Sequence, residues 1–221
     1  MLSATSQATE LWPRRILMVL PYANIGGTER HVQLLSRGLG ELGLEVGVAM
    51  PEGPAVDAFA KEGVRLRLLP TPSVMSLPAW VKALSREAAE GADLVHVHAA
   101  MEMVWASRWA HPSRPTVFTS HGYHMEVDYM KAGMMLNRSA GAVIAVSEFE
   151  RSRLLRYGLS SSLTQVVPNG IDLDGLAGPP GTLRQELSLP EGSRLIGMVN
   201  RLDAFKGVDL MLKALPRLRE R

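Results

Sequence analysis

Short apolar runs alternate with helical patterns along most of this chain, and no hairpin turn joins two neighbouring runs. We expect strands over seven of these runs: 16–20, 46–50, 64–69, 93–98, 115–119, 142–146 and 163–167. We expect helices between them over 29–42, 57–62, 78–90, 101–109, 127–138 and 148–157. Because strands of this kind are joined by helical crossovers, the order predicts an α/β fold, a parallel sheet with helices on both faces.

The pattern changes after Pro168, where the turn Asn169-Gly170 is followed by a segment rich in glycine and proline. One short helical piece is expected near 183–187, then a strand over 194–200 and a helix over 207–219. One strand and one helix cannot make a sheet, so a second domain is expected to be truncated. The predicted divisions are a disordered lead-in at 1–13, a first domain at 14–170, a linker at 171–193 and an incomplete second domain at 194–221.

Charge and composition exclude several classes of protein. The formal net charge is only +2 despite a pI of 9.1, so bulk charge gives nucleic-acid binding no support. The chain has no cysteine, which excludes disulfides and thiolate chemistry and suits a reducing compartment. Pro21 ends the first apolar run too early for a signal peptide, and no run approaches the ~18 apolar residues of a membrane span. We expect a soluble, cytoplasmic protein.

A basic turn between the expected strand at 194–200 and the helix at 207–219 is a candidate anion site. It holds two cations five positions apart, Arg201 and Lys206, and Gly207 follows the second directly. Backbone N–H groups and the helix dipole favour negative charge at a helix N-terminus, and the arginine fork can bind phosphate oxygens. A turn of this kind also occurs as an ordinary surface loop, so other residues have to support the assignment.

Two further places lie where strands of the first domain end, which is where open parallel sheets bind ligands. Gly26-Gly27 follows the first strand and permits close backbone approach ahead of a helix, although the pair can also form a simple tight turn. The spaced third glycine of the dinucleotide fingerprint is missing. His121, followed by Gly122, can point into a cleft or can cap a helix.

Four histidines have spacings that resemble a zinc cluster: His96, His98, His121 and His124. Structural zinc sites usually include cysteine, and a catalytic site usually has a carboxylate or third histidine on a stable helix. His96 and His98 share one face of a strand, a position that core packing commonly fills. We therefore expect no metal.

Five motifs occur in order and together resemble glycosyltransferase family 4, whose members have GT-B architecture. The motifs are Gly26-Gly27-Thr28-Glu29, Thr119-Ser120-His121-Gly122, Ile144-Ala145-Val146-Ser147-Glu148, Val167-Pro168-Asn169-Gly170-Ile171-Asp172 and Asn200-Arg201-Leu202-Asp203-Ala204-Phe205-Lys206-Gly207. The resemblance runs from about Arg14 to the end of the chain. Each motif alone is weak, whereas five in order are specific.

The resemblance implies a hexosyltransferase with two Rossmann-like domains and a nucleotide-diphosphate sugar between them. It assigns Arg201 and Lys206 to the donor diphosphate, Gly26 and Gly27 to the approach from the first domain, and His121 to the transferring sugar. It also implies retention of the anomeric configuration and no metal, because cations and backbone dipoles stabilise the leaving diphosphate. The Glu-rich segment with which the family grips the donor sugar does not follow Gly207, so the chain is expected to be inactive as it stands.

Two other functions stay open: a fragment that binds an acceptor or partner without turnover, and a related GT-B nucleotide-sugar 2-epimerase. The acceptor, whether glycan, lipid or small molecule, is not determined by the sequence. The segment 126–138 with Arg151, Arg153 and Arg156 forms either a basic, partly apolar surface for anionic lipid at the inner membrane face, or two ordinary amphipathic helices.

Overall fold

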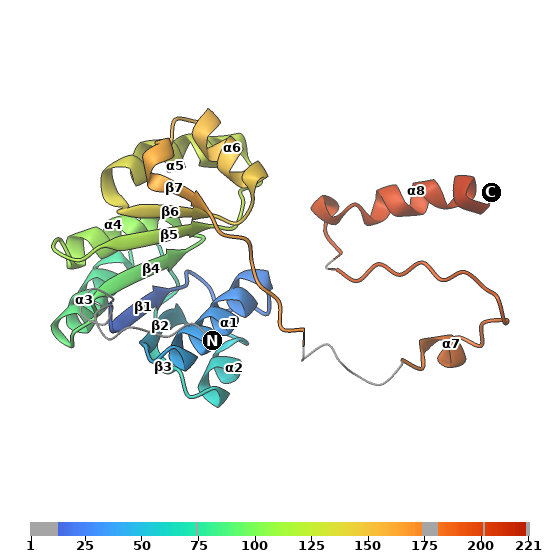
Figure 1. The fold of residues 1–221 in the computed structure, drawn as a ribbon, viewed down its shortest axis with the longest axis horizontal. Coiled ribbons are helices and arrows are strands. Elements are labelled where there is room, and N and C mark those ends of the chain that lie inside the picture. Colours follow the sequence, from blue (N-terminus) through green and yellow to red (C-terminus); the bar gives the residue numbers. More distant parts are fainter. Residues whose placement is uncertain (1–12, 74, 174–180, 201, 220–221) are drawn as a thin grey trace, which may run out of the picture. The chain divides into compact units, whose positions relative to one another are not determined.

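Seven strands form one sheet in the computed structural model, which describes residues 13–73, 75–173, 181–200 and 202–219. The strands are β1 (Arg15–Val19), β2 (Glu45–Pro51), β3 (Arg65–Leu69), β4 (Leu94–His98), β5 (Thr116–Ser120), β6 (Ala142–Ala145) and β7 (Thr164–Val166). Their order across the sheet is β3-β2-β1-β4-β5-β6-β7, and every neighbouring pair is parallel (Figure 1). All seven carboxyl ends therefore lie along one edge of the sheet.

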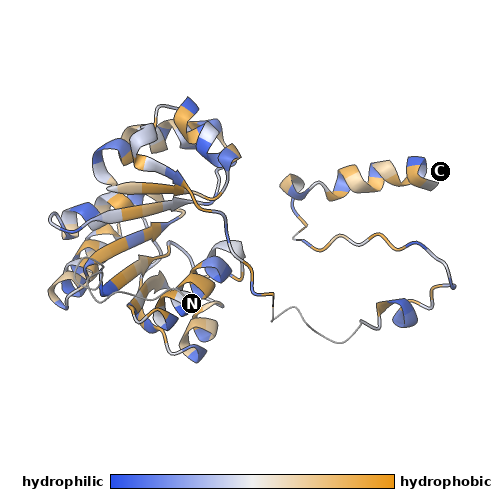
Figure 2. Cartoon of the chain, in the orientation of Figure 1, coloured by the Kyte–Doolittle hydropathy of each residue, from blue (hydrophilic) through white to orange (hydrophobic). Residues whose placement is uncertain are grey.

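Six helices connect the strands and cover the two faces of the sheet. They are α1 (Gly27–Glu41), α2 (Val56–Lys61), α3 (Leu77–Ala89), α4 (Met101–Ala110), α5 (Glu126–Ser139) and α6 (Glu148–Arg156). On one face α1 and α2 pack on Met18 and Val48, whereas α3 to α6 pack on the other face around Val95 and Phe118. The strands that separate these layers are mainly apolar (Figure 2). The sheet has two cores because its strands bury both faces.

One buried carboxylate fixes α3 to the edge strand β3. Glu87 is almost fully buried, and its two oxygens lie 2.5 Å from Arg65 Nη2 and 2.6 Å from Arg67 Nη2. The two arginines stand two positions apart on β3 and therefore reach the same face. A buried charge is tolerated only when it is paired, so this contact explains how the charged face of α3 can lie against the sheet.

The chain divides between Asp172 and Leu173 into two units, and the second has no buried core among the residues that the structure describes there. It contains α7 (Leu183–Glu186), a 3-10 helix (Ala204–Lys206) and α8 (Val208–Arg219). Several apolar side chains of this unit, among them Ile196, Val199 and Leu202, are more than half exposed. Hydrophobic burial therefore contributes little to the stability of this unit taken by itself.

The predicted α/β fold is confirmed, and each predicted strand and helix of the sheet unit lies within two residues of its observed bounds. The helix predicted over 207–219 is also present, as α8. The strand predicted over 194–200 is wrong, because this segment forms no ladder with any described residue. An apolar run provides strand propensity, but a strand exists only when another strand supplies hydrogen bonds. Residues 1–12, most of the predicted lead-in, lie outside the described residues.

Gly133 tests how closely α5 approaches the end of α6. A Cβ added at Gly133 would lie 2.2 Å from the carbonyl oxygen of Tyr157, so Gly133→Ala must push the two helices apart. We expect a loss of about 1–3 kcal/mol in the free energy of unfolding, measured by urea denaturation. Gly38→Ala in α1 is the matched control, because its Cβ would meet nothing within 4 Å. The free energy of unfolding of that control should rise by about 0.5–1 kcal/mol, because alanine has a higher helix propensity than glycine. An unchanged free energy of unfolding in Gly133→Ala would contradict the close packing of α5 and α6.

Candidate functional site

The candidate site lies where the chain reverses its direction across the sheet. From β1 the chain adds β2 and β3 on one side, then returns to place β4 on the other side of β1. The segments that leave β1 and β4 at the carboxyl edge therefore diverge, which opens the crevice where ligands bind in such sheets. The loop 20–26, His98 at the end of β4 and His121 just after β5 all belong to this edge.

A buried glutamate shapes the loop between β1 and α1. Gly26 is the N-cap of α1 in an extended conformation, and Glu29 in the first turn is buried. Its carboxylate accepts a hydrogen bond of 2.8 Å from the backbone nitrogen of Asn24, which holds the loop in place. Gly27 is exposed, and a Cβ built there would meet nothing within 4 Å. The N-terminal end of α1 thus presents open space beside its backbone.

Four histidines meet beside this loop: His31 from α1, His96 and His98 from β4, and His121. The ring of His121 lies 5.0 Å from that of His31 and 5.6 Å from that of His98, between centroids. The His98 Nδ1 atom lies 3.3 Å from the His121 Nε2 atom, and His96 Nε2 lies 2.7 Å from the hydroxyl of Thr119. His96 and His98 project from the same face of β4, and their rings are 4.1 Å apart.

Burial keeps these imidazoles neutral at pH 7. It lowers the pKa of His96 to about 3 and that of His121 to about 4, with a further lowering from the neighbouring rings. The pKa of fully buried His98 is also well below its ordinary value, and desolvation lowers that of His31. The Nε2 atom of His98 is buried and has no hydrogen-bond partner among the described residues. The histidines of the site are therefore uncharged at pH 7.

A second buried carboxylate fixes the turn that carries His121. Glu150 of α6 accepts hydrogen bonds from the Ser120 hydroxyl at 2.5 Å and the Tyr129 hydroxyl at 2.7 Å. The same Tyr129 hydroxyl accepts a hydrogen bond of 3.1 Å from the backbone nitrogen of Tyr123. Gly122, at φ 97°, adopts the left-handed conformation that the turn requires. Glu150 thus joins strand β5, helix α5 and helix α6 next to the turn that carries His121.

The structure brings some of the predicted site residues together. Gly26, Gly27 and His121 belong to one unit and to one edge of its sheet. Lys206 is exposed at the end of the 3-10 helix in the second unit, and Arg201 lies outside the described residues. His124 is exposed and does not belong to the group of histidines whose nitrogens converge.

Sequence reasoning missed three residues of the site: Glu29, His31 and Glu150. Glu29 is the last residue of the motif Gly26-Gly27-Thr28-Glu29, so the motif itself could have indicated a role for this side chain. His31 follows Gly27 by four residues, which places it one helical turn further along α1. Glu150 stands three residues after Ser147, the spacing of a capping box, but its carboxylate bonds Ser120 and Tyr129.

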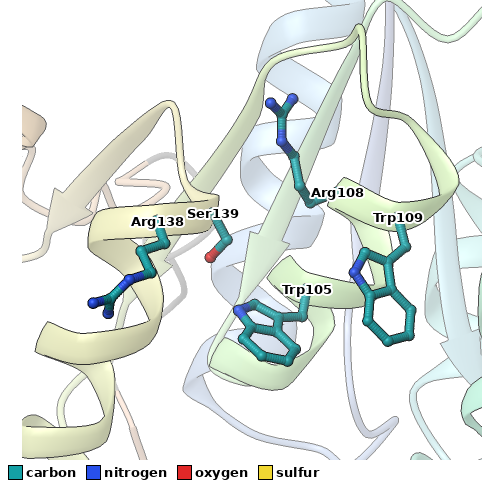
Figure 3. A pocket seen from close by; sticks show the side chains of 5 residues that line it. All are labelled: Trp105, Arg108, Trp109, Arg138 and Ser139. Atoms are coloured by element: carbon teal, nitrogen blue, oxygen red, sulfur yellow. The ribbon is translucent and has the colours of Figure 1, made fainter.

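A separate pocket lies at the opposite end of α4 and α5, away from the carboxyl edge. It is lined by Trp105, Arg108, Trp109, Arg138 and Ser139 (Figure 3). The two indole rings project from the same side of α4, with their centroids 6.1 Å apart. Since α4 and α5 start from the carboxyl ends of β4 and β5, their last turns lie near the strand starts.

A parallel sheet with polar side chains gathered at its switch point is the arrangement of α/β ligand-binding domains. The family model described as Glycosyltransferase Family 4 matches residues 25–174. The chain therefore belongs to glycosyltransferase family 4, as the sequence motifs predicted.

Individual relatives agree with this family. The D-inositol 3-phosphate glycosyltransferase of Xylanimonas cellulosilytica is 27% identical over an alignment of 240 positions, which covers 88% of this chain and 56% of the relative. The glycogen synthase of Thermus thermophilus is 25% identical over 287 positions, which cover 90% of this chain and 64% of the relative. The chain thus spans between half and two thirds of the length of these two proteins.

Solved structures show the same fold. Anabaena HepE, solved in complex with UDP and glucose, is 21% identical and superposes with a TM-score of 0.77 over 93% of this chain and 58% of its own. A glycosyltransferase from Rickettsia africae gives a TM-score of 0.78 at 21% identity, over 95% of this chain and 58% of its own.

In the described part of the chain, no helix has the length and apolar character to cross a membrane.

The buried histidines make the stability of the sheet unit depend on pH. Their folded-state pKa values lie below the ordinary 6.5, so below that pH the unfolded chain binds protons that the folded chain does not. Stability is therefore fully present above about pH 6.5 and falls as the pH falls. A group such as His96 should contribute a loss of about 1.4 kcal/mol by pH 5.5.

Urea denaturation at pH 7.5 and 5.5, in the presence of EDTA, measures this dependence above the range where carboxylates titrate. His96→Gln should remove about 1.4 kcal/mol of the difference between the two pH values, because it removes one such group. The same substitution at exposed His124 is the control for loss of a histidine. Equal stability of the unaltered chain at the two pH values would show that the histidines are not held neutral.

Proposed function

We propose that this chain supplies one wall of a nucleotide-sugar site and takes part in glycosyl transfer to an acceptor. One observation carries the proposal: the open backbone at Gly27 and the ring of His121 both belong to the carboxyl edge of the sheet, beside the β1/β4 switch point. Family membership and the likeness to HepE, solved with UDP and glucose, support it.

Each part of this wall has a distinct role in the proposal. The N-terminal end of α1, left open at Gly27, faces the donor diphosphate, because helix N-termini favour anions. His121, neutral at pH 7, contacts the transferring sugar through a ring nitrogen, which can donate or accept a hydrogen bond to a hydroxyl. Glu150 positions that histidine by holding Ser120 and Tyr129 under the turn.

The second unit contributes cations to the proposed reaction. Lys206, together with Arg201, stabilises the negative charge that develops on the diphosphate as the bond to the sugar C1 breaks. The acceptor oxygen bonds to C1 on the face of the sugar from which the phosphate leaves. The proton of the acceptor hydroxyl passes to the departing phosphate, and the configuration at C1 is retained. These cations and the backbone dipoles supply the charge stabilisation, so the proposed transfer uses no metal.

Binding to the 221-residue chain tests the proposal without requiring turnover. The probe is UDP-glucose, observed by saturation-transfer NMR, with GDP-mannose and ADP-glucose as alternatives for the base and sugar. Gly27→Ala fills the open space and should weaken the saturation-transfer signal of all donor protons. His121→Ala should remove the signal of the sugar protons and leave the signal of the nucleotide protons. His124→Gln is the control and should match the unaltered chain.

The outcomes separate the functions under comparison. No saturation of any donor would contradict the donor site and favour a fragment that binds an acceptor or partner. Sugar saturation that survives His121→Ala would refute the role of that histidine. Conversion of the bound sugar to its 2-epimer would identify an epimerase. We propose that transfer itself needs the length that the relatives have beyond this chain, so no radiolabelled sugar should move to an acceptor here.

The pocket between α4 and α5 supports a second proposal, contact with an anionic membrane surface. Trp105 and Trp109 are 45% and 65% exposed, and Arg108 and Arg138 flank them (Figure 3). Tryptophan prefers the membrane–water interface, and arginine adds attraction to anionic headgroups. The arginines of α6 support this less, since Arg153 lies over the Tyr129 ring at 4.4 Å and Arg151 pairs with Glu148.

Co-sedimentation with vesicles tests the membrane contact. The double variant Trp105→Ser/Trp109→Ser should lower binding to phosphatidylglycerol vesicles by roughly 10-fold or more, because two indoles no longer enter the interface. Leu42→Ser, at an apolar residue that is 77% exposed elsewhere on the chain, is the matched control. Equal binding of the chain to pure phosphatidylcholine vesicles, or no binding at all, would contradict the proposal.

A further inference from the structure

We propose that His31, His98 and His121 form a binding site for a divalent transition-metal ion of the zinc class. The three residues come from α1, the end of β4 and the turn after β5, so the fold and not a local motif assembles them. Each ring offers one nitrogen, and the three nitrogens all lie within 4.8 Å of one another. All three residues belong to the sheet unit, so the site is complete within one unit.

The distances fit four-coordinate geometry with a small adjustment. Zinc–nitrogen bonds of about 2.0–2.1 Å at tetrahedral angles place two ligand nitrogens about 3.3 Å apart. The His98 Nδ1 and His121 Nε2 atoms already have this separation, at 3.3 Å. His31 is only partly buried on α1, so its side chain can move the remaining distance, about 1.5 Å at most by the same geometry.

The environment of His98 is the second observation that points to a ligand. Its side chain is fully buried, and its Nε2 atom has no hydrogen-bond partner among the described residues. Among the described residues its Nδ1 atom has one polar contact, with His121 Nε2, which is long for a hydrogen bond between rings. An ion bound at Nδ1 would give that buried nitrogen a full partner, which the long contact with His121 does not. Metal bonding to this ring would replace one weak contact with a stronger one.

The set of ligands differs from the one that the sequence suggested. His96 is bonded to Thr119 and His124 is exposed, so neither joins the converging nitrogens, and His31 takes the third place. Three neutral imidazoles suit Zn²⁺, Co²⁺, Ni²⁺ and Cu²⁺ and exclude Mg²⁺ and Ca²⁺, which prefer oxygen. Three protein ligands leave a fourth position open for water or an anion.

A metal at this site would act as a competitor of the sugar, not as a cofactor of transfer. This part rests on the proposed function, which gives His121 to the transferring sugar. We assign the sugar hydroxyl to His121 Nε2, so an ion bound to this atom takes the place of the sugar contact. Occupancy by zinc and by a nucleotide sugar should therefore be mutually exclusive, whereas ion binding itself does not depend on any transfer activity.

The test uses the untagged 221-residue chain, freed of metal with a chelator and titrated with Co²⁺. We expect one ion per chain with the intense visible absorption of four-coordinate Co²⁺, displaced by Zn²⁺ in calorimetry. His31→Gln should lower the affinity by roughly 10²-fold or more, because removing a ligand costs at least as much as disturbing its support. His124→Gln is the matched control and should bind as the unaltered chain does.

His31 is the informative position because it lies at a partly exposed point of α1, so its loss should leave the fold intact, as circular dichroism would show. A weak six-coordinate Co²⁺ spectrum, a stoichiometry other than one, or equal affinity in His31→Gln would overturn the site. Saturation-transfer NMR with UDP-glucose, with and without Zn²⁺, examines the competition. Tight binding of one ion that leaves the sugar signal unchanged would uphold the site and refute the role of His121 toward the sugar.

Discussion

The return of the chain across the sheet between β3 and β4 is the constraint on which the rest of the structure depends. Parallel strands need helical crossovers of one hand, so strands added on opposite sides of β1 require helices on opposite faces. Helices α1 and α2 therefore cover one face, and α3 to α6 cover the other. The crevice between β1 and β4 follows from this connection alone, before any polar side chain is placed in it.

The buried carboxylates beside this crevice are satisfied by hydrogen bonds, for Glu29 within its own loop and for Glu150 between elements distant in sequence. Glu29 holds the loop that precedes α1, and Glu150 holds the turn after β5 through Ser120 and Tyr129. Glu87 serves the same purpose at the far side of the sheet, against Arg65 and Arg67. Each buried carboxylate bonds its donors directly, so the cost of burying its charge is offset locally.

The sequence was sufficient to predict the strands and helices of the sheet unit, because their patterns depend on local spacing. It also predicted that Gly26, Gly27 and His121 lie at one edge, since every parallel strand ends there. It was not sufficient for His31, because the face that a helix turns toward a neighbouring strand depends on packing between distant elements. The role of Glu150 was hidden for a similar reason, since its spacing from Ser147 suggests a backbone partner. The strand expected over 194–200 needed a neighbour that no local pattern reveals.

Because several elements share the Glu150 carboxylate, the two sides of the crevice differ in the number of elements that hold them. The turn with His121 is tied at one point to β5, α5 and α6, and Gly133 lets α5 and α6 lie in close contact below it. The opposite side is the exposed stretch at Gly26 and Gly27, whose carboxylate brace comes from Glu29. The histidine side is therefore tied to three elements, whereas the glycine side is held by a hydrogen bond between its loop and the first turn of α1.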